Sequence, residues 1–173
     1  MEELRDSGRY LLGKKNLIVV EIGVNIGTNA VTLLNNLDIA MLHLVDPFLE
    51  YSDTGNPEEL SMSQDQLDAD YLTLQKNMIP YAGKVNIVKD SSAEAAEMYP
   101  DGFFDYAYAD ACHASISVAA DIAAWWPKVK SGGVLAGHDF YSYSGVKEAV
   151  ENFIAQTGLE LLGEGVDWYV VKP

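Results

Sequence analysis

Five short apolar runs alternate with segments of helical periodicity, and this alternation restricts the fold of the chain more than any other feature. The apolar runs span residues 17–22, 41–45, 85–89, 103–109 and 134–136. Strands that alternate with helices form a mainly parallel sheet with helices on both faces. The nearly continuous apolar character of the first run is typical of a central strand that is buried on both sides. We therefore predict an α/β fold with a doubly wound, Rossmann-like sheet.

The helices are expected between these runs. Apolar positions recur at helical spacing, and residues that favour helix starts precede several of the segments. Three expected helices span about residues 28–36, 115–126 and 145–156. A fourth begins at a cap at Ser63 and ends near residue 78, and a fifth begins at a cap at Ser91 or Ser92 and ends near residue 98. The polar stretch at residues 50–63 is the longest candidate loop, and we expect it to act as a lid over a binding site.

Two further strands are expected at residues 159–162 and 168–171. The short connection between them excludes a parallel crossover, so they should pair in antiparallel orientation. The sheet is thus predicted to have seven strands, mostly parallel, with a C-terminal antiparallel hairpin. Residues 1–173 fit one domain, in which residues 1–16 form an N-terminal helical extension.

The charge and composition narrow the classes of partner. The formal net charge is −15, and the eleven Lys and Arg residues form no basic cluster, which disfavours nucleic acid as a partner. No apolar run approaches the roughly 20 residues of a membrane span. The first residues lack the layout of a signal peptide, and Cys112 is the one cysteine of the chain. These features predict no membrane association and a cytoplasmic location.

A glycine-containing loop follows the first predicted strand. Glu21-Ile-Gly-Val-Asn-Ile-Gly27 joins this strand to a helix, and its two glycines allow a tight turn and a close approach of a ligand. The loop lacks the third glycine of G-x-G-x-x-G, and the chain has no G-x-x-x-x-G-K-[ST] motif. Asp46 ends the second strand, where an acidic side chain accepts hydrogen bonds from a ribose diol, or else it is a turn residue before Pro47. The pattern indicates a nucleoside ligand without a pyrophosphate and disfavours a nucleotide-dependent dehydrogenase.

The ordered set of motifs resembles the class I S-adenosylmethionine-dependent methyltransferases, specifically the methyltransferase-24 type. The resemblance covers nearly everything from Leu17 onward. It rests on the following segments: Val20–Gly27, Val45-Asp46-Pro47, Phe104–His113, Asp121–Gly133, Leu135–Phe140, Gly145–Val150 and Trp168–Lys172.

This resemblance implies S-adenosylmethionine as the cofactor and assigns roles to the residues at the strand ends. It places the methionine and ribose portions at Glu21, Gly23, Asn25 and Gly27, the ribose hydroxyls at Asp46, adenine at Ser91 and Ser92, and the methyl group at Asp110. Asp90 replaces a residue that is usually small in the family, which weakens the adenine assignment.

Asp110 is the strongest candidate for chemistry, and three interpretations of its surroundings remain open. Asp110 and Asp139 could hold a divalent metal ion with His113 or His138, and the ion would lower the pKa of an acceptor hydroxyl. The His138-Asp139 pair departs from the Asp-Asp or Asp-Asn pair of some related O-methyltransferases and suits a softer metal than magnesium. Alternatively, His113 or Asp110 is a general base. In the third interpretation, Asp110 caps a helix and the histidines are structural.

The expected function is transfer of a methyl group from S-adenosylmethionine to a small-molecule acceptor, with a hydroxyl oxygen as the accepting atom. The catalytic candidates are Asp110, His113 and His138. The competing hypothesis is a catalytically inactive S-adenosylmethionine-binding protein or partner subunit. Because so few residues lie outside the expected core domain, a homodimer that completes the acceptor site is a further expectation.

Overall fold

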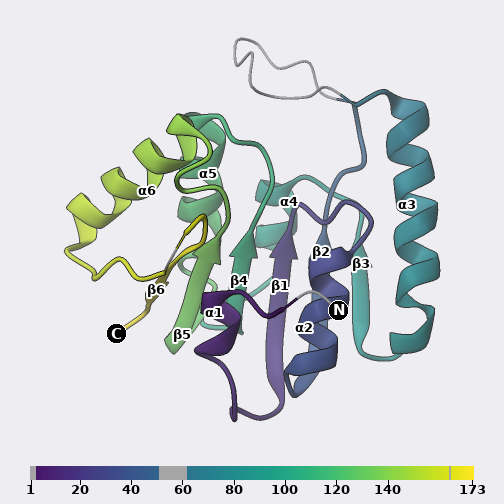
Figure 1. The fold of residues 1–173 in the computed structure, drawn as a ribbon, viewed down its shortest axis with the longest axis horizontal. Coiled ribbons are helices and arrows are strands. Elements are labelled where there is room, and N and C mark those ends of the chain that lie inside the picture. Colours follow the sequence, from purple (N-terminus) through teal and green to yellow (C-terminus); the bar gives the residue numbers. More distant parts are fainter. Residues whose placement is uncertain (1–2, 51–61, 164) are drawn as a thin grey trace.

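The computed structural model describes residues 3–50, 62–163 and 165–173, and it has a central sheet between two layers of helices (Figure 1). The six strands run in the order β3-β2-β1-β4-β5-β6. Pairing is parallel except between β5 and β6. The strands are β1 (Leu17–Ile22), β2 (Ile39–Val45), β3 (Val85–Val88), β4 (Phe104–Ala109), β5 (Val129–Gly137) and β6 (Trp168–Val171). The predicted Rossmann-like α/β fold with a mostly parallel sheet is confirmed.

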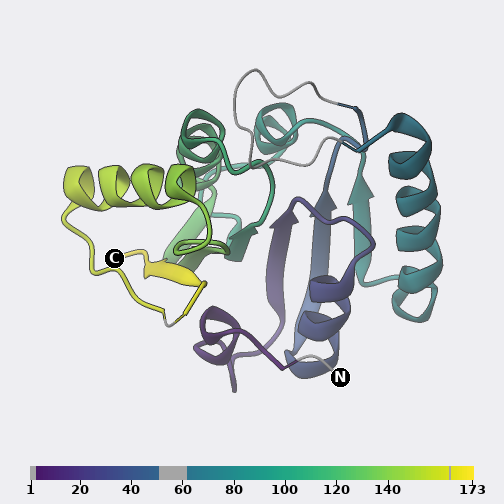
Figure 2. The same ribbon diagram turned by 45° about the horizontal axis from the view of Figure 1, so that its top comes forward.

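The helices cover the two faces of this sheet, each over a separate apolar core (Figure 2). They are α1 (Asp6–Arg9), α2 (Thr28–Asn36), α3 (Gln64–Met78), the 3-10 turn η1 (Ile79–Tyr81), α4 (Ser92–Glu97), α5 (Ser115–Trp125) and α6 (Ser144–Thr157). The helices α2 and α3 and the segment around α1 pack on one face, and α4, α5 and α6 pack on the other. No helix in the described part of the chain is long and apolar enough to cross a membrane.

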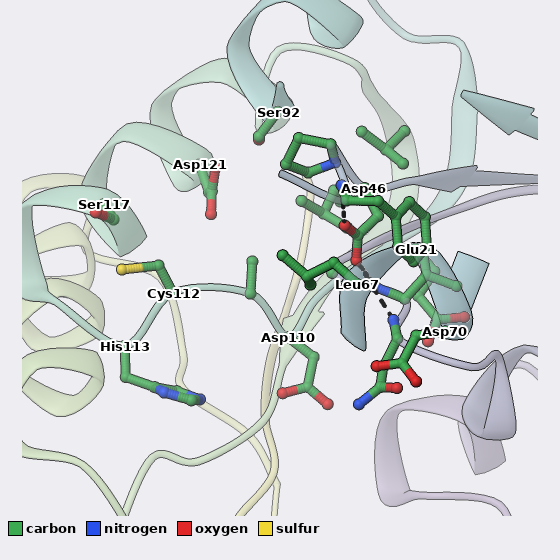
Figure 3. Close-up of a pocket in the computed structure, with 18 of the residues that line it drawn as sticks. Glu21, Asp46, Leu67, Asp70, Ser92, Asp110, Cys112, His113, Ser117 and Asp121 are labelled. Atoms are coloured by element: carbon green, nitrogen blue, oxygen red, sulfur yellow. Dashed lines mark hydrogen bonds between the residues drawn. The ribbon is translucent and has the colours of Figure 1, made fainter. Parts of the chain in front are cut away.

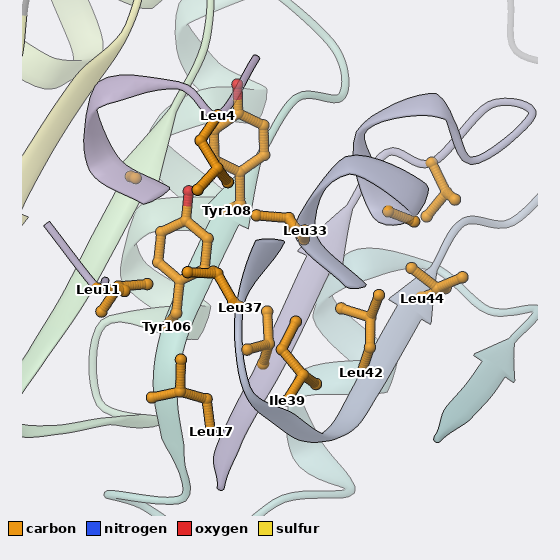
Figure 4. Close-up of a cluster of buried hydrophobic side chains, with 14 of the residues drawn as sticks. Leu4, Leu11, Leu17, Leu33, Leu37, Ile39, Leu42, Leu44, Tyr106 and Tyr108 are labelled. Atoms are coloured by element: carbon orange, nitrogen blue, oxygen red, sulfur yellow. The ribbon is translucent and has the colours of Figure 1, made fainter. Parts of the chain in front are cut away.

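Strand β1 shows why the sequence gives this layered arrangement. Val19 belongs to the core under α2, and its neighbour Val20 belongs to the core under α5. Because side chains alternate between the faces of a strand, a strand buried on both faces needs consecutive apolar residues. Figure 4 shows the first of these cores, in which Leu4 and Leu11 from the N-terminal segment lie over Tyr106 of β4. The N-terminal extension is therefore part of the domain core.

The sheet differs from the prediction in the number of strands. Residues 159–162 form one antiparallel bridge, between Leu162 and Tyr169, rather than a seventh strand. Leu159 and Leu161 instead pack against the core on the α6 face, so the segment 159–162 pairs with β6 at a single position. The antiparallel orientation is as expected, but the predicted hairpin is reduced to one residue pair.

Strand β5 begins earlier than predicted and contains the two glycines that were expected to precede it. The register between β4 and β5 shifts between Phe104 and Tyr106, opposite Val129 and Val134. Gly132 lies within this irregular stretch with a φ of +75°. A glycine tolerates the left-handed backbone of a bulge, so the pair bends the strand without ending it.

The helix boundaries agree closely with the expected ones. The helix α2 spans the predicted residues 28–36, and the Ser63 hydroxyl accepts a hydrogen bond from the backbone N–H of Gln66 at 3.4 Å, as a cap of α3. The lid expected at residues 50–63 falls almost entirely on residues 51–61, which lie outside the described residues.

The strand order places a ligand crevice at the centre of the sheet. From β1 the chain continues into α2 on one face, and from the adjacent β4 it continues into α5 on the other. Connections that leave neighbouring strands in opposite directions open a crevice at the carboxyl ends of these strands. The glycine-containing loop after β1 and Asp110 after β4 lie on the two sides of this crevice.

Candidate active site

A cavity of about 970 Å³ occupies this crevice (Figure 3). Its size is at the upper end of the range of 300–1,000 Å³ that is common for small-molecule sites. Most of the predicted site residues line it: Glu21, Gly23, Asn25, Asp46, Ser91, Ser92, Asp110, His113 and Asp139. Gly27 does not line the cavity, and His138 lines a small neighbouring pocket that shares Asp110 and His113.

The loop after β1 holds its shape through left-handed backbone positions. Gly23, Asn25 and Gly27 have φ angles of +78°, +51° and +82°. A Cβ atom at Gly23 would overlap the backbone carbonyl of Asp110 and would lie 2.7 Å from the Cα atom of Ala111. Glycine is therefore required at position 23, both because the φ angle there is positive and because the chain after β4 passes so close.

Asp46 fixes this loop to the end of β2. One carboxylate oxygen accepts hydrogen bonds from the backbone N–H groups of Val24 and Asn25 at 2.9 and 3.3 Å. The other oxygen accepts from the backbone N–H of Phe48 at 2.9 Å. Asp46 thus has the turn role that was one of its two expected roles, and it also lines the cavity.

Glu21 is a buried acid at the base of the cavity, 2% exposed. Its Oε1 atom accepts a hydrogen bond from the Asn29 amide at 3.3 Å, whereas Oε2 has no hydrogen-bond partner among the described residues. Burial raises the pKa of Glu21 to about 8; the hydrogen bond from Asn29 opposes this rise, and the charge of Asp110 adds a smaller contribution to it. A buried carboxyl with an unpaired oxygen is costly, and such groups concentrate at functional sites.

The start of α4 forms another wall of the cavity. Ser91 caps this helix by accepting from the backbone N–H of Glu94 at 3.4 Å. Ser92 accepts a hydrogen bond from the Trp125 indole N–H at 2.9 Å and is hydrogen-bonded to Asp121. Burial raises the pKa of Asp121, and the hydrogen bond with Ser92 partly offsets this shift.

Asp110, His113, His138 and Asp139 gather at the ends of β4 and β5. One carboxylate oxygen of Asp139 lies 3.1 Å from His113 Nε2 and 3.1 Å from His138 Nδ1. His138 Nδ1 lies 3.9 Å from Asp110 Oδ1. Burial raises the pKa of Asp110, His138 opposes that rise, and the nearby charge of Asp139 adds to it.

Among the described residues, Asp110, His113 and Asp139 form a group that could hold a metal ion. One ligand atom from each lies within 4.8 Å of the others. Both predicted histidines lie close to Asp139, but of the two His113 is the one in this group and on the wall of the main cavity. His138 contacts Asp139 but lines the small neighbouring pocket instead of the main cavity.

The chain after β5 holds the His113 ring in place. Its imidazole stacks on Tyr143, with ring centroids 3.9 Å apart and planes 5° from parallel. Gly145 lets this contact form, because a Cβ atom there would lie 2.8 Å from the Ser115 backbone nitrogen. Two segments that are distant in the sequence thus fix one side chain.

The lining residues that were not predicted from the sequence include two charged residues with contacts inside the cavity wall. Asp121 lies on α5, and Arg5 reaches the cavity from the N-terminal segment. The position of Asp121, between the buried Val118 and Trp125 of an apolar helix, is a signal that could have found it. Arg5 carries no local signal, because only the tertiary fold brings it near the strand ends.

The fold and the cavity define a Rossmann-like domain with a large cavity at the carboxyl ends of its strands. A family model described as a methyltransferase domain matches residues 20–140, which is more than half of the chain. The chain belongs to this methyltransferase-24 family of class I S-adenosylmethionine-dependent methyltransferases, and the resemblance found in the sequence is confirmed.

Solved structures show the same fold at low sequence identity. A candidate methyltransferase from Streptococcus mutans, in complex with S-adenosylhomocysteine, is 14% identical with a TM-score of 0.68 and covers 96% of each chain. The O-methyltransferase NovP is 17% identical with a TM-score of 0.68, covering 96% of this chain and 78% of its own. An rRNA methylase from Streptococcus thermophilus is 12% identical with a TM-score of 0.61, and the match covers 95% of this chain and 90% of the methylase. No curated protein sequence matches the chain.

Proposed function

We propose that this protein transfers the methyl group of S-adenosylmethionine to a hydroxyl oxygen of a small-molecule acceptor. The observation that carries this proposal is one continuous cavity, which joins the glycine-containing loop and Asp46 to the cluster of Asp110, His113 and Asp139. A methyl transfer needs donor and acceptor in one water-poor space, with the attacking oxygen and the methyl carbon in line and near contact.

In this proposal the cofactor lies across the ends of β2, β1 and β4. The ribose hydroxyls donate to Asp46, and adenine lies near Ser91 and Ser92, with Asp121 beside it. The amino-acid end lies near Glu21 and Gly23, so that the sulfonium methyl faces Asp110. The Streptococcus mutans protein with the same fold was solved with S-adenosylhomocysteine, which supports this class of ligand.

The reaction is a single displacement. An oxygen lone pair of the acceptor attacks the methyl carbon, the carbon–sulfur bond breaks, and its electrons neutralise the sulfonium to give S-adenosylhomocysteine. The hydroxyl proton passes to His113, and Asp139, 3.1 Å away, stabilises the imidazolium that forms. Tyr143 keeps the ring in place for this step.

A second candidate is assistance by a divalent metal ion, and the grouping of Asp110, His113 and Asp139 favours it. Two carboxylates and one imidazole fit a transition-metal ion, and the imidazole makes the set less suited to magnesium. A bound ion would lower the pKa of the acceptor hydroxyl. Asp110, His113 and Asp139 would then hold the ion, and His138, 3.1 Å from Asp139, would orient that carboxylate.

Replacing His113 with glutamine separates the two candidates. If His113 is the base, we expect turnover in metal-free buffer to fall about 10²–10⁴-fold. The matched variant His138→Gln should fall less, because His138 does not line the cavity. Turnover and melting temperature are then measured during titration with manganese, zinc and magnesium. If none of these ions changes either quantity, the metal candidate is wrong, and if chelation abolishes turnover, the metal-free base is wrong.

The charge of the protein supports a small acceptor. The rRNA methylase shares the fold alone, whereas a net charge of −15 opposes binding of a polyanion. An acceptor screen that measures release of S-adenosylhomocysteine tests this proposal, with hydroxylated small molecules and RNA as the two arms. Methylation of RNA would contradict the proposed substrate class. Cofactor binding without turnover on any acceptor would favour the inactive binder or partner subunit. The homodimer stays a prediction, which light scattering of the purified protein tests.

A further inference from the structure

Arg5 is a cation in a cavity that is otherwise acidic. It lies immediately before α1, outside residues 20–140 that the family model matches. Among the described residues that line the cavity, it is the sole Lys or Arg. The acidic lining residues are Glu21, Asp46, Glu50, Asp70, Asp110, Asp121 and Asp139. A single permanent positive charge in these surroundings marks the place where an anionic group of a ligand would bind.

The fold holds Arg5 in place on one side and leaves most of its donors unused. Its Nη1 atom donates to Asp167 Oδ1 at 3.3 Å, and the Tyr108 hydroxyl donates to the same oxygen at 3.4 Å. The guanidinium lies 5.7 Å from the centre of the Tyr108 ring. A guanidinium has five N–H donors, and within the described part of the chain one is engaged. The Arg5 side chain is 29% exposed, so it is neither sealed in the core nor free in solvent.

The N-terminal segment is fixed well enough to support this role. Leu4 is buried beside Arg5, and the Ser7 hydroxyl is hydrogen-bonded to the Tyr106 hydroxyl at 2.7 Å in the interior. A binding group gains from such anchoring, because less conformational entropy is lost when the ligand binds.

We propose that Arg5 binds the carboxylate at the amino-acid end of S-adenosylmethionine, while the unpartnered Oε2 of Glu21 accepts from the ammonium group on the same carbon. This inference rests on the proposed function. Arg5 and Glu21 line the same cavity beside Gly23, and a guanidinium with a carboxyl group that ionises on binding matches the carboxylate and the ammonium of an amino acid. The N-terminal segment thereby completes a cofactor site that the family region alone leaves open.

The test compares two ligands that differ in this amino-acid end. S-adenosylhomocysteine carries it, and 5′-methylthioadenosine has the same adenosyl thioether without it. For Arg5→Gln we expect calorimetry to show a loss of about 10–100-fold in affinity for S-adenosylhomocysteine, from the loss of charge-assisted hydrogen bonds. Affinity for 5′-methylthioadenosine should be unchanged. The matched control is Arg9→Gln, which removes an exposed arginine of the same segment and should change neither affinity.

The ratio of the two affinities makes the result independent of stability. An unchanged ratio in Arg5→Gln overturns the proposal, whether both ligands lose affinity through a structural defect or neither does. An unchanged ratio is also the result expected if Arg5 binds a carboxylate of the acceptor instead. If the wild-type protein fails to bind S-adenosylhomocysteine, the proposed function itself is wrong, and this outcome is distinguishable because it needs no variant.

Discussion

Gly23→Ala is expected to abolish binding of S-adenosylhomocysteine and to lower the free energy of unfolding by about 3–5 kcal/mol. Alanine at a φ of +78° is strained, and its Cβ atom would overlap the carbonyl of Asp110. The atoms that this Cβ would meet, in Asp110 and Ala111, belong to the backbone, which cannot move away as a flexible side chain would. Relief of the overlap must therefore separate the ends of β1 and β4, where the cofactor is proposed to lie. Denaturant unfolding and calorimetry measure the two effects.

Gly132→Ala is the matched control for this variant. Gly132 has a φ of +75°, close to that of Gly23, but a Cβ atom there would meet nothing within 4 Å. Gly132→Ala therefore introduces the backbone strain without an overlap, and its free energy of unfolding should fall by about 1–2 kcal/mol. Its affinity for S-adenosylhomocysteine should equal that of the wild type. Equal stability losses in the two variants would contradict the importance of the close passage between Gly23 and Asp110.

Glu21→Gln is expected to change how stability depends on pH. The folded-state pKa of Glu21, about 8, lies above its ordinary value of 4.5. The folded protein therefore retains a proton that the unfolded chain loses between these values. The stabilisation is complete below pH 4.5 and is lost progressively as the pH rises to about 8. Relative to the wild type, the glutamine variant should gain up to about 1.4 kcal/mol per pH unit across this window. Urea unfolding at several pH values measures the difference, and parallel profiles would contradict it.

The same variant should bind the cofactor more weakly. If the ammonium of the ligand pairs with Glu21, the carboxyl must ionise, so binding of S-adenosylhomocysteine near pH 7 releases up to one proton from the wild-type protein. Glutamine cannot ionise, so the variant lacks the ion pair with the ammonium of the ligand, and its affinity for S-adenosylhomocysteine should fall about 10–100-fold. Calorimetry in buffers of different ionisation enthalpy counts the protons. Equal proton release from Glu21→Gln and the wild type would show that Glu21 is not the group that ionises.

Local patterns in the sequence were sufficient to predict most of the fold and several residues that line the cavity. The alternation of apolar runs with helical periodicity gave the parallel sheet, because each pattern records which faces of an element are buried. The rule that ligands bind at the carboxyl ends of strands then selected Glu21, Asp46 and Asp110, and all three line the cavity.

The remaining features depend on contacts between segments that are distant in the sequence. The choice between His113 and His138 was open, because it depends on how the ends of β4 and β5 meet and on the ring of Tyr143. Arg5 reaches the cavity only because the N-terminal segment packs over β4. The strand expected at residues 159–162 was wrong because Leu159 and Leu161 fit the core on the α6 face. Each of these outcomes depends on tertiary packing.

The most direct test of the central claim is calorimetry of the purified protein with S-adenosylmethionine, S-adenosylhomocysteine and NAD, repeated with Gly23→Ala. We expect the wild-type protein to bind both S-adenosyl ligands with one site per chain and to bind no NAD. Gly23→Ala should bind none of the three. Binding of NAD in preference to S-adenosylhomocysteine, or binding of S-adenosylhomocysteine that survives in Gly23→Ala, would contradict a cofactor site at the glycine-containing loop.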